Sequence, residues 1–321
     1  MSLTMIEKIK KLKNEISKVI VNYEEVIEKI LICIFSRGHV LLVGVPGLAK
    51  TLMVKTLSQA LDLKFSRIQF TPDLMPSDIL GTEIIQEGPN GRFFQFIKGP
   101  IFANVILADE INRTPPKTQS ALLEAMQEKK VTILGKTYEL EEPFFVLATQ
   151  NPIEQEGTYP LAEAQVDRFM MEIRLNYPSF ENEIEIVRRT TIEQNYEIEK
   201  VLNKDDILTI QRKVREIAVG EHVIKYAISL VRRTRPSETD LEIVKKYVQF
   251  GAGPRASQFL IIGAKAKAFL ENREFANTDD VKFIFFDVLR HRIILNFLAE
   301  ADNIKVEDIL NEILEKTPIK I

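Results

Sequence analysis

The sequence is poor in the residues that carry redox and metal chemistry. Its 321 residues include only one cysteine, Cys33, and three histidines, His39, His222 and His291, which are far apart. One cysteine cannot form an internal disulfide, and the histidines show no metal-ligand spacing. We therefore expect an ordinary buried thiol at Cys33 and predict neither a disulfide framework nor a zinc site.

Long apolar runs and a strong excess of one charge are also missing. No apolar run approaches the roughly 18 residues that a membrane span requires, and residues 1–13 mix Lys and Glu with apolar side chains, unlike a signal peptide. We therefore expect a cytoplasmic protein without membrane insertion. A net charge of -3 gives no overall attraction to nucleic acid or to an anionic membrane, although it does not exclude a local basic patch.

Apolar patterns predict two domains, as the chain length also suggests. Before Pro178, short continuous apolar runs alternate with helical patterns, and such runs are typical of strands buried in a parallel sheet that helices cover on both faces. After Pro178 the strand patterns fade. We predict an α/β domain at residues 1–177 and an all-α domain at residues 178–321. The predicted strands are 39–43, 65–70, 105–108, 144–148 and 171–175.

Two segments break this alternation with hairpin patterns. Residues 83–86 and 92–97 flank a turn that contains Pro89 and Asn90, and residues 131–133 and 137–140 flank a turn around Gly135. We expect both hairpins to project from the α/β domain. The predicted helices are 24–35, 51–61, 117–129, 180–190, 204–218, 221–233, 241–250, 255–271, 279–299 and 306–316.

The segment Gly44–Thr51 follows a predicted buried strand and precedes a predicted helix. It matches the phosphate-loop pattern GxxxxGK[ST], except that Ala49 stands at the second glycine. In such a loop, backbone N–H groups surround the β-phosphate, Lys50 reaches the β and γ oxygens, and the Thr51 hydroxyl binds Mg²⁺. A plain turn before a solvated helix start is the alternative, which this setting disfavours. The predicted ATP-binding residues are Gly44, Val45, Pro46, Gly47, Leu48, Ala49, Lys50, Thr51, Leu52 and Asp109.

Two further predicted strands end in polar residues that suit nucleotide hydrolysis. Strand 105–108 ends in Asp109, which can hold the hydration shell of Mg²⁺, and Glu110, which can polarise the water that attacks the γ-phosphate. Paired acids are also common in surface loops, but buried strands seldom end in two of them. Strand 144–148 leads to Asn151, whose amide could orient that water unless it only forms a turn. Because the carboxyl ends of parallel strands line one crevice, we expect all three beside the loop.

Phosphoryl transfer usually also needs an arginine, supplied in cis or by a neighbouring molecule. The candidates are Arg168, at the end of a short helix, Arg255, which opens a helix of the all-α domain, and Arg113, just after the acid pair. A single arginine is more often a surface charge with a satisfied partner, so the pattern leaves these candidates open. The predicted catalytic residues are Glu110, Asn151, Arg168 and Arg255, and the predicted Mg²⁺ ligands are Thr51 and Asp109.

Together these segments resemble a MoxR-type AAA+ ATPase. The resemblance runs from about Ile20 to the C-terminus and implies an AAA+ P-loop NTPase core with an all-α lid domain. Ala49 is the form that this family itself tends to show. Val21-Asn22-Tyr23 stands where relatives more often show a Gly-Gln pair, which leaves the adenine contacts open. The matching segments are GVPGLAKT at 44–51, QFTPDLMPSDILG at 69–81, LADEINRTPPKTQSALLEAMQE at 107–128, LATQNPIEQEGTYPLAEAQVDRF at 147–169 and GPRAS at 253–257.

The resemblance implies roles that spacing alone does not give. The hairpin at 83–97 looks like a helix-2 insertion and the one at 131–140 like a pre-sensor insertion, both projecting toward the pore of a ring. The implied site residues are Lys50 and Thr51 of Walker A, Asp109 and Glu110 of Walker B, Asn151 as sensor 1, Arg168 as the arginine finger that reaches a neighbouring subunit, and Arg255 as sensor 2.

The implied function is that of a homo-oligomeric ATPase, a hexameric ring, which remodels or matures client proteins in a chaperone-like way. Members of the family often assemble with proteins carrying a von Willebrand factor A domain, in some cases to insert metal cofactors. Two other functions stay open. One is a nucleotide-gated binding module with incidental turnover. The other is a helicase or nucleic-acid loader, which the net charge and Glu87 disfavour and the lysines and arginine of the hairpins favour.

Overall fold

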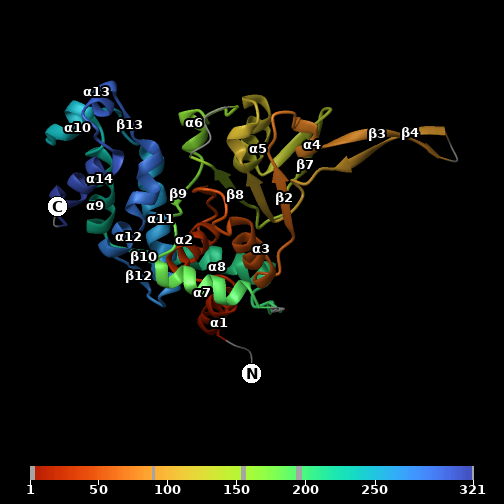
Figure 1. Ribbon diagram of the computed structural model, residues 1–321, viewed down its shortest axis with the longest axis horizontal. Coiled ribbons are helices and arrows are strands. Elements are labelled where there is room, and N and C mark those ends of the chain that lie inside the picture. The colour runs from red at the N-terminus through yellow and green to blue at the C-terminus, as the bar shows by residue number, and fades with distance from the viewer. Residues whose placement is uncertain (1–3, 89–90, 153–156, 193–196, 320–321) are drawn as a thin grey trace. The chain divides into compact units, whose positions relative to one another are not determined.

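The computed structural model describes residues 4–88, 91–152, 157–192 and 197–319 (Figure 1). Pro89 and Asn90 of the first predicted hairpin turn, and residues 153–156 of one matching segment, lie outside these ranges. The chain forms two compact units. The α/β unit comprises residues 1–24, 41–168 and 174–208, and the helical unit comprises residues 25–40, 169–173 and 209–321. The predicted domain boundary after residue 177 stays a prediction.

A five-stranded sheet with the order β2-β5-β8-β1-β9 positions the candidate site. β2, β5 and β8 pair in parallel, with Phe65 opposite Val105 and Val105 opposite Phe145. Every residue of β5 is buried, as expected of a strand that is covered on both faces. The predicted parallel sheet is confirmed. Its strands are β1 (Val40–Val43), β2 (Phe65–Gln69), β5 (Val105–Asp109), β8 (Phe145–Gln150) and β9 (Met171–Arg174).

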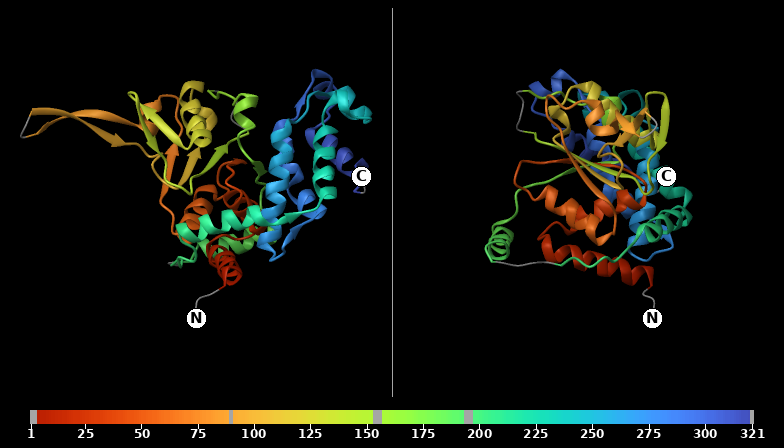
Figure 2. Two further views of the ribbon diagram at one scale, coloured as in Figure 1. Left: turned by 180° about the vertical axis from the view of Figure 1, so that it is seen from behind. Right: turned by 90° about the vertical axis from the view of Figure 1, so that its right-hand side faces the viewer.

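Helix α1 (Met5–Val19) packs against α3 (Lys50–Ala60), as Figure 2 shows. It begins at a capping box, in which the Thr4 hydroxyl accepts the Glu7 N–H and the Glu7 carboxylate accepts the Thr4 N–H. Its buried side chains, Ile9, Leu12 and Ile16, recur at three- and four-residue spacing on one face. The other helices of the α/β unit are α4 (Pro76–Leu80), η1 (Ile111–Arg113), α5 (Pro116–Glu128), α6 (Glu163–Val166), α7 (Phe180–Thr190) and the start of α8 (Lys204–Glu216).

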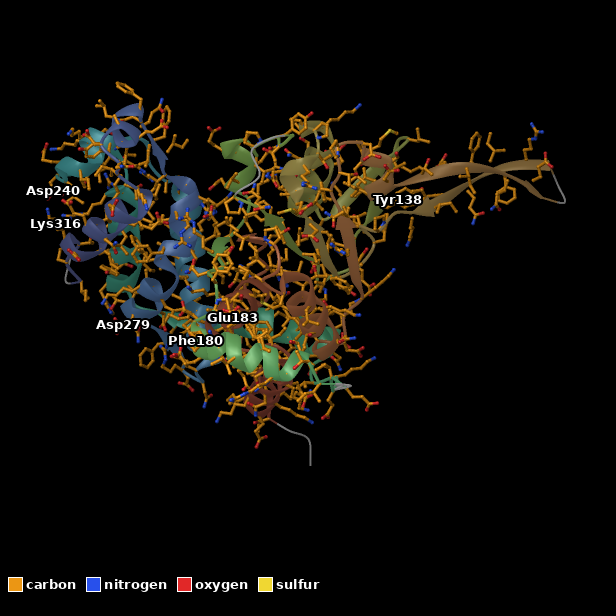
Figure 3. All side chains as sticks on the ribbon, in the orientation of Figure 1. Tyr138, Phe180, Glu183, Asp240, Asp279 and Lys316 are labelled. Carbon is orange, nitrogen blue, oxygen red and sulfur yellow. The ribbon has the colours of Figure 1, made fainter. Side chains whose placement is uncertain are left out.

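Both predicted hairpins are present. β3 (Gly81–Gly88) pairs antiparallel with β4 (Gly91–Lys98), and β6 (Lys130–Ile133) with β7 (Lys136–Glu139). Figure 1 shows β3 and β4 extending well beyond the sheet. At their base, Phe96 stacks on Tyr138 of the second hairpin with ring centroids 4.4 Å apart. Figure 3 labels Tyr138 at this place. Lys136 and Glu83 add an ion pair of 3.2 Å between the same two hairpins. The second hairpin therefore supports the root of the first.

The helical unit contains α2 (Glu24–Phe35) from Glu25 onward, and Cys33 of this helix is fully buried as expected. Two pairs of very short strands, β10–β12 and β11–β13, accompany the helices and were not predicted. Among the described residues, no helix combines the length and apolarity needed to cross a membrane. The remaining elements of the unit are α9 (Glu221–Arg232), η2 (Pro236–Glu238), α10 (Glu242–Tyr247), α11 (Pro254–Leu270), α12 (Thr278–Leu289), η3 (Arg290–Arg292), α13 (Phe297–Ala301), α14 (Val306–Lys316), β10 (Ala218–Val219), β11 (Val248–Phe250), β12 (Phe275–Ala276) and β13 (Ile294–Leu295).

The prediction of one continuous helix over residues 279–299 is wrong. α12 ends at Leu289, and α13 begins after Asn296. The Asn296 side chain accepts the N–H groups of Leu298 and Ala299, which caps a new helix. Between the two helices the buried Arg292 donates to the backbone carbonyls of Phe169 and Val288. These contacts outweigh the helical periodicity of the sequence.

Candidate functional site

Three neighbouring strands of the sheet deliver the predicted site residues to one place. β5, β8 and β1 are adjacent, and their carboxyl ends lead into the Asp109-Glu110 pair, Asn151 and the loop that starts at Gly44. The Gly44 N–H donates to the carbonyl of Gln150 at 3.2 Å, so the loop begins against the end of β8. A first cavity of about 420 Å³ lies there, lined by Pro46, Gly47, Leu48, Ala49, Lys50, Thr51, Leu52, Asp109, Glu110 and Asn151.

The backbone of the loop explains its residue types. Gly47 has a φ of 88°, in the left-handed region that favours glycine. Gly44 is needed for a different reason, because a Cβ there would lie 2.9 Å from the Cβ of Leu175. Ala49 is left-handed too, with a φ of 54°, which costs an L-residue about 1 kcal/mol. The loop thus keeps the shape that a second glycine would give, and α3 starts directly after it at Lys50.

Lys50 lies across the loop from its starting glycine. Its ammonium donates to the Gly44 carbonyl at 2.7 Å. Burial lowers the pKa of Lys50, while the carboxylates of Asp109 and Glu110 oppose that shift. The ammonium is therefore held inside the first cavity together with the two acids.

Thr149 connects the two acids and was not predicted. Its hydroxyl donates to Asp109 Oδ1 at 2.6 Å and accepts the Glu110 backbone N–H at 2.8 Å. Thr149 is completely buried, and Glu110 has the left-handed φ of 58°. The parallel register would have indicated this contact, because Ala108 pairs with Ala148 and the next residues of both strands are therefore neighbours.

Two side chains of β2 bind the same acids and were also missed. Asp109 Oδ2 accepts hydrogen bonds from Arg67 Nε at 3.1 Å and from Arg67 Nη2 at 2.5 Å. Gln69 Oε1 accepts a hydrogen bond from Arg67 Nη2 at 2.7 Å, and Gln69 Nε2 donates to Glu110 Oε2 at 2.9 Å. The register of β2 with β5 places Gln69 opposite Asp109. Edge strand β2 therefore contributes to the site, although its sequence suggested only a strand.

The three candidate arginines have different surroundings. Arg113 lies 3.3 Å from Glu110 Oε2 in an ion pair. Arg168 is half-buried and donates to the Leu123 carbonyl of α5 at 2.8 Å, and it is not among the residues that line the first cavity. Arg255 is the second residue of α11 in the helical unit.

A second cavity of about 320 Å³ shares five residues with the first, Pro46 to Ala49 and Leu52. It includes Val21 and Tyr23, from the segment where the adenine contacts were left open, and burial raises the pKa of Tyr23. Figure 3 shows Phe180 and Glu183 at the start of α7, a helix that forms one wall. The remaining lining residues are Val19, Ile20, Tyr177, Pro178, Glu183, Ile186, Arg189 and Thr190.

The oxygen atoms of the first cavity suit one particular class of metal ion. Within the described ranges, no three His, Cys, Asp or Glu side chains cluster as a metal site. Mg²⁺ does not need such a cluster, because it prefers oxygen ligands and is commonly bound by one or two carboxylates together with substrate phosphates. The Thr51 hydroxyl and the Asp109 carboxylate are oxygen donors in the same cavity. The residues present therefore fit Mg²⁺ that enters with a nucleotide.

Comparison with known proteins agrees with this geometry. Residues 39–171 match the ATPase family associated with various cellular activities (AAA), and residues 241–313 match the AAA lid domain. The chain is 45% identical to Chaperone MoxR1 of Mycobacterium tuberculosis over 94% of this chain and 79% of the relative. It is 29% identical to Protein MoxR of Methylorubrum extorquens over 95% of this chain and 93% of that protein.

A solved structure is similar over nearly the whole chain. The crystal structure of a candidate ATPase from Cytophaga hutchinsonii superposes with a TM-score of 0.91 at 50% sequence identity, covering 98% of this chain and 95% of the other. Sequence and fold thus agree along both the nucleotide-binding core and the lid. The chain belongs to the MoxR family of AAA+ ATPases.

Proposed function

We propose that the first cavity binds ATP with Mg²⁺ and that Glu110 acts as the base that activates the attacking water. The observation that carries this proposal is the shared cavity, in which the loop, Thr51 and both strand-end acids meet. Backbone N–H groups of the loop and the Lys50 ammonium would hold the phosphates at the N-terminus of α3. Thr51 and Asp109 would hold Mg²⁺, which stabilises the negative charge that develops during phosphoryl transfer.

The hydrogen bonds around the acids support separate roles for them. Thr149 binds the Asp109 carboxylate and the Glu110 backbone N–H, so it fixes the peptide from which the Glu110 side chain extends. The Glu110 carboxylate itself contacts Gln69 and Arg113. Asn151, which lines the same cavity, would orient the water from the end of the neighbouring strand β8.

The second cavity is proposed to take the adenine and ribose. It adjoins the loop through Leu48 and offers the apolar side chains of Ile20 and Val21 together with the rings of Tyr23 and Tyr177. Flat apolar groups bind well between such side chains. Binding there would leave the triphosphate directed toward Lys50 in the first cavity.

The arginines are proposed to complete the site through assembly. Arg168 does not line the first cavity of its own chain, so we propose that it reaches the ATP of a neighbouring subunit in a hexameric ring. Arg255 is proposed to report the nucleotide state to the lid, and Arg113 to orient Glu110 through their ion pair. ATP between two subunits would then couple hydrolysis to their relative movement.

The proposed biological role is chaperone-like remodelling of a client protein in the cytoplasm. A relative with 45% identity is named a chaperone. The long hairpin exposes Ile85, Phe93 and Phe94, with 62%, 49% and 68% of their surfaces accessible, and such side chains suit contact with an unfolded client or a partner carrying a von Willebrand factor A domain. Two of its charges neutralise each other, since Arg92 pairs with Glu87 at 3.1 Å, which disfavours nucleic acid.

Two variants test the hydrolysis proposal. Glu110→Gln should retain ATP binding and lose hydrolysis by about 100-fold or more, because the amide cannot accept the proton of water. Lys50→Ala should weaken ATP binding itself. The measurements are phosphate release and binding of a fluorescent ATP analogue. If Glu110→Gln hydrolysed ATP as fast as the wild type, Glu110 would not be the base.

Mixing variants tests the proposed ring. Lys50→Ala and Arg168→Ala subunits should each be inactive alone. Mixed together they should regain part of the activity, because some interfaces then combine an intact loop with an intact arginine. Analytical ultracentrifugation with and without a non-hydrolysable ATP analogue provides the assembly state. A strictly monomeric protein under both conditions would refute the role of Arg168 in trans.

A further inference from the structure

The Asp109 carboxylate is fully engaged on one of its oxygens. Oδ2 accepts two N–H groups of Arg67, at 3.1 and 2.5 Å, and Oδ1 accepts the Thr149 hydroxyl. The carboxylate is mostly buried, with 12% of the side chain exposed, whereas the Arg67 side chain is 47% exposed. A buried acid is thus neutralised by an arginine that reaches it from the solvent side. Because the Arg67 side chain is half exposed, packing does not prevent it from moving away.

This arrangement conflicts with the binding of Mg²⁺ to the same carboxylate. An oxygen that accepts two N–H groups has used both of its lone pairs. In addition, a guanidinium and a divalent cation repel each other strongly at hydrogen-bond distances in a partly buried site. Oδ1 accepts the Thr149 hydroxyl, and Thr149 is buried and is fixed by the Glu110 N–H. The exchangeable partner of Asp109 is therefore Arg67.

We propose that Arg67 is the counter-ion of Asp109 in the nucleotide-free protein and that it is displaced when ATP brings Mg²⁺ to this carboxylate. The proposal rests on the proposed function of the first cavity. Arg67 is a positioning residue, since it acts through Asp109. It pairs with the Asp109 carboxylate and holds it in place before ATP arrives, and it opposes Mg²⁺ binding because this ion pair must break.

The Mg²⁺ dependence of nucleotide binding tests this competition without measuring hydrolysis. The affinity of a fluorescent ATP analogue is measured in excess Mg²⁺ and in excess EDTA, and the ratio of the two affinities reports the contribution of Mg²⁺. In Arg67→Ala, Mg²⁺ no longer competes with the guanidinium, and the Asp109 carboxylate, which has lost its ion pair with Arg67, repels metal-free ATP more strongly. Both effects raise the ratio, by about three- to tenfold for a charge pair of this exposure.

Two further variants serve as controls. Lys200→Ala removes a cation from an exposed ion pair with Asp62, 2.7 Å long, which is not part of the site, and should leave the ratio at the wild-type value. Arg67→Lys keeps the charge but loses the two-pronged contact, so its ratio should lie between wild type and Arg67→Ala. If Arg67→Ala does not fold, as judged by circular dichroism, Arg67→Lys alone decides the question.

The outcomes separate the inference from the proposed function. An unchanged or lowered ratio in a folded Arg67 variant overturns the competition, because it shows that Arg67 does not oppose Mg²⁺ at Asp109. Failure of the wild-type protein to bind the analogue with and without Mg²⁺ would instead refute the nucleotide site itself. A raised ratio in Lys200→Ala as well would trace the effect to overall charge and would also overturn the inference.

Discussion

Replacing Thr149 with valine removes one hydroxyl from the centre of the site and changes little else. Valine has nearly the same shape, so the completely buried position should stay filled. The change removes a hydrogen bond to the Asp109 carboxylate and leaves the Glu110 N–H without its partner. A hydrogen bond to a charged group contributes about 1.5–3 kcal/mol, and an unpartnered buried N–H costs about 1–3 kcal/mol. Since the two contributions are not additive, we expect the free energy of unfolding to fall by about 2–4 kcal/mol.

The same substitution should affect hydrolysis more than binding. Without the hydroxyl, Asp109 is oriented only by the exposed Arg67, and the peptide that aims Glu110 is no longer fixed. We expect kcat for ATP to fall by about 10- to 100-fold, because catalytic groups that are slightly misplaced lose much of their effect. Binding of an ATP analogue in EDTA should stay close to that of wild type, since the loop and Lys50 are intact.

Thr149→Ser provides the matched control, because serine keeps the hydroxyl and loses only a methyl group. Differential scanning fluorimetry measures the stability, and the loss expected for Thr149→Val corresponds to a decrease in melting temperature of roughly 3–6 °C. Phosphate release under saturating ATP measures kcat. If Thr149→Val melted and hydrolysed ATP like Thr149→Ser, the hydroxyl would not organise the two acids, and the reasoning from these contacts would be wrong.

Other parts of the molecule give three further predictions. Burial, and next the charge of Arg292, lower the pKa of His291 well below its usual value, so the unfolded chain binds a proton that the folded chain does not. Stability should therefore fall as pH drops below about 6.5, by at most about 1.4 kcal/mol per pH unit, and urea unfolding at pH 5.5 and 7.5 should show this component reduced in His291→Gln. Tyr138→Ala removes the stacking on Phe96, worth about 0.5–1.5 kcal/mol beyond the buried area, and should speed amide hydrogen exchange at the root of the long hairpin without changing exchange in β5. Leu12→Ala empties a completely buried position of α1 and should cost about 2–5 kcal/mol by chemical denaturation, and a cost under 1 kcal/mol would show that α1 does not pack as described.

Much of the candidate site could be predicted because its residues carry local patterns. The loop at 44–51 lies between a buried strand and a helix, and Asp109 and Glu110 end a strand that is buried throughout. Asn151 follows a third such strand. The topology rule for parallel sheets then brought these segments together, since it needs only the positions of the strand ends. Their meeting in one cavity follows from those few facts.

The residues that were missed share a different property. Arg67, Gln69 and Thr149 belong to the site only because of which residue lies opposite them on the next strand, and strand register is not visible in one sequence. Arginine and glutamine on an edge strand otherwise look like solvent-facing side chains. The long helix predicted over 279–299 failed for a related reason. Its apolar periodicity is real, but the contacts of Arg292 and the cap at Asn296 are tertiary and local features that periodicity does not report.

The register also explains why the acids are surrounded by partners of two kinds. At the carboxyl ends of three parallel strands, Gln69, Asp109 and Thr149 lie side by side at one level of the sheet. Thr149 comes from a central strand, is completely buried and can therefore be a permanent partner, while Arg67 and Gln69 come from the edge strand β2 and remain partly open to solvent. A site that must hold an acid in place and yet yield it to an incoming cation needs one partner of each kind. The strand order β2-β5-β8 supplies them on opposite sides of the same carboxylate.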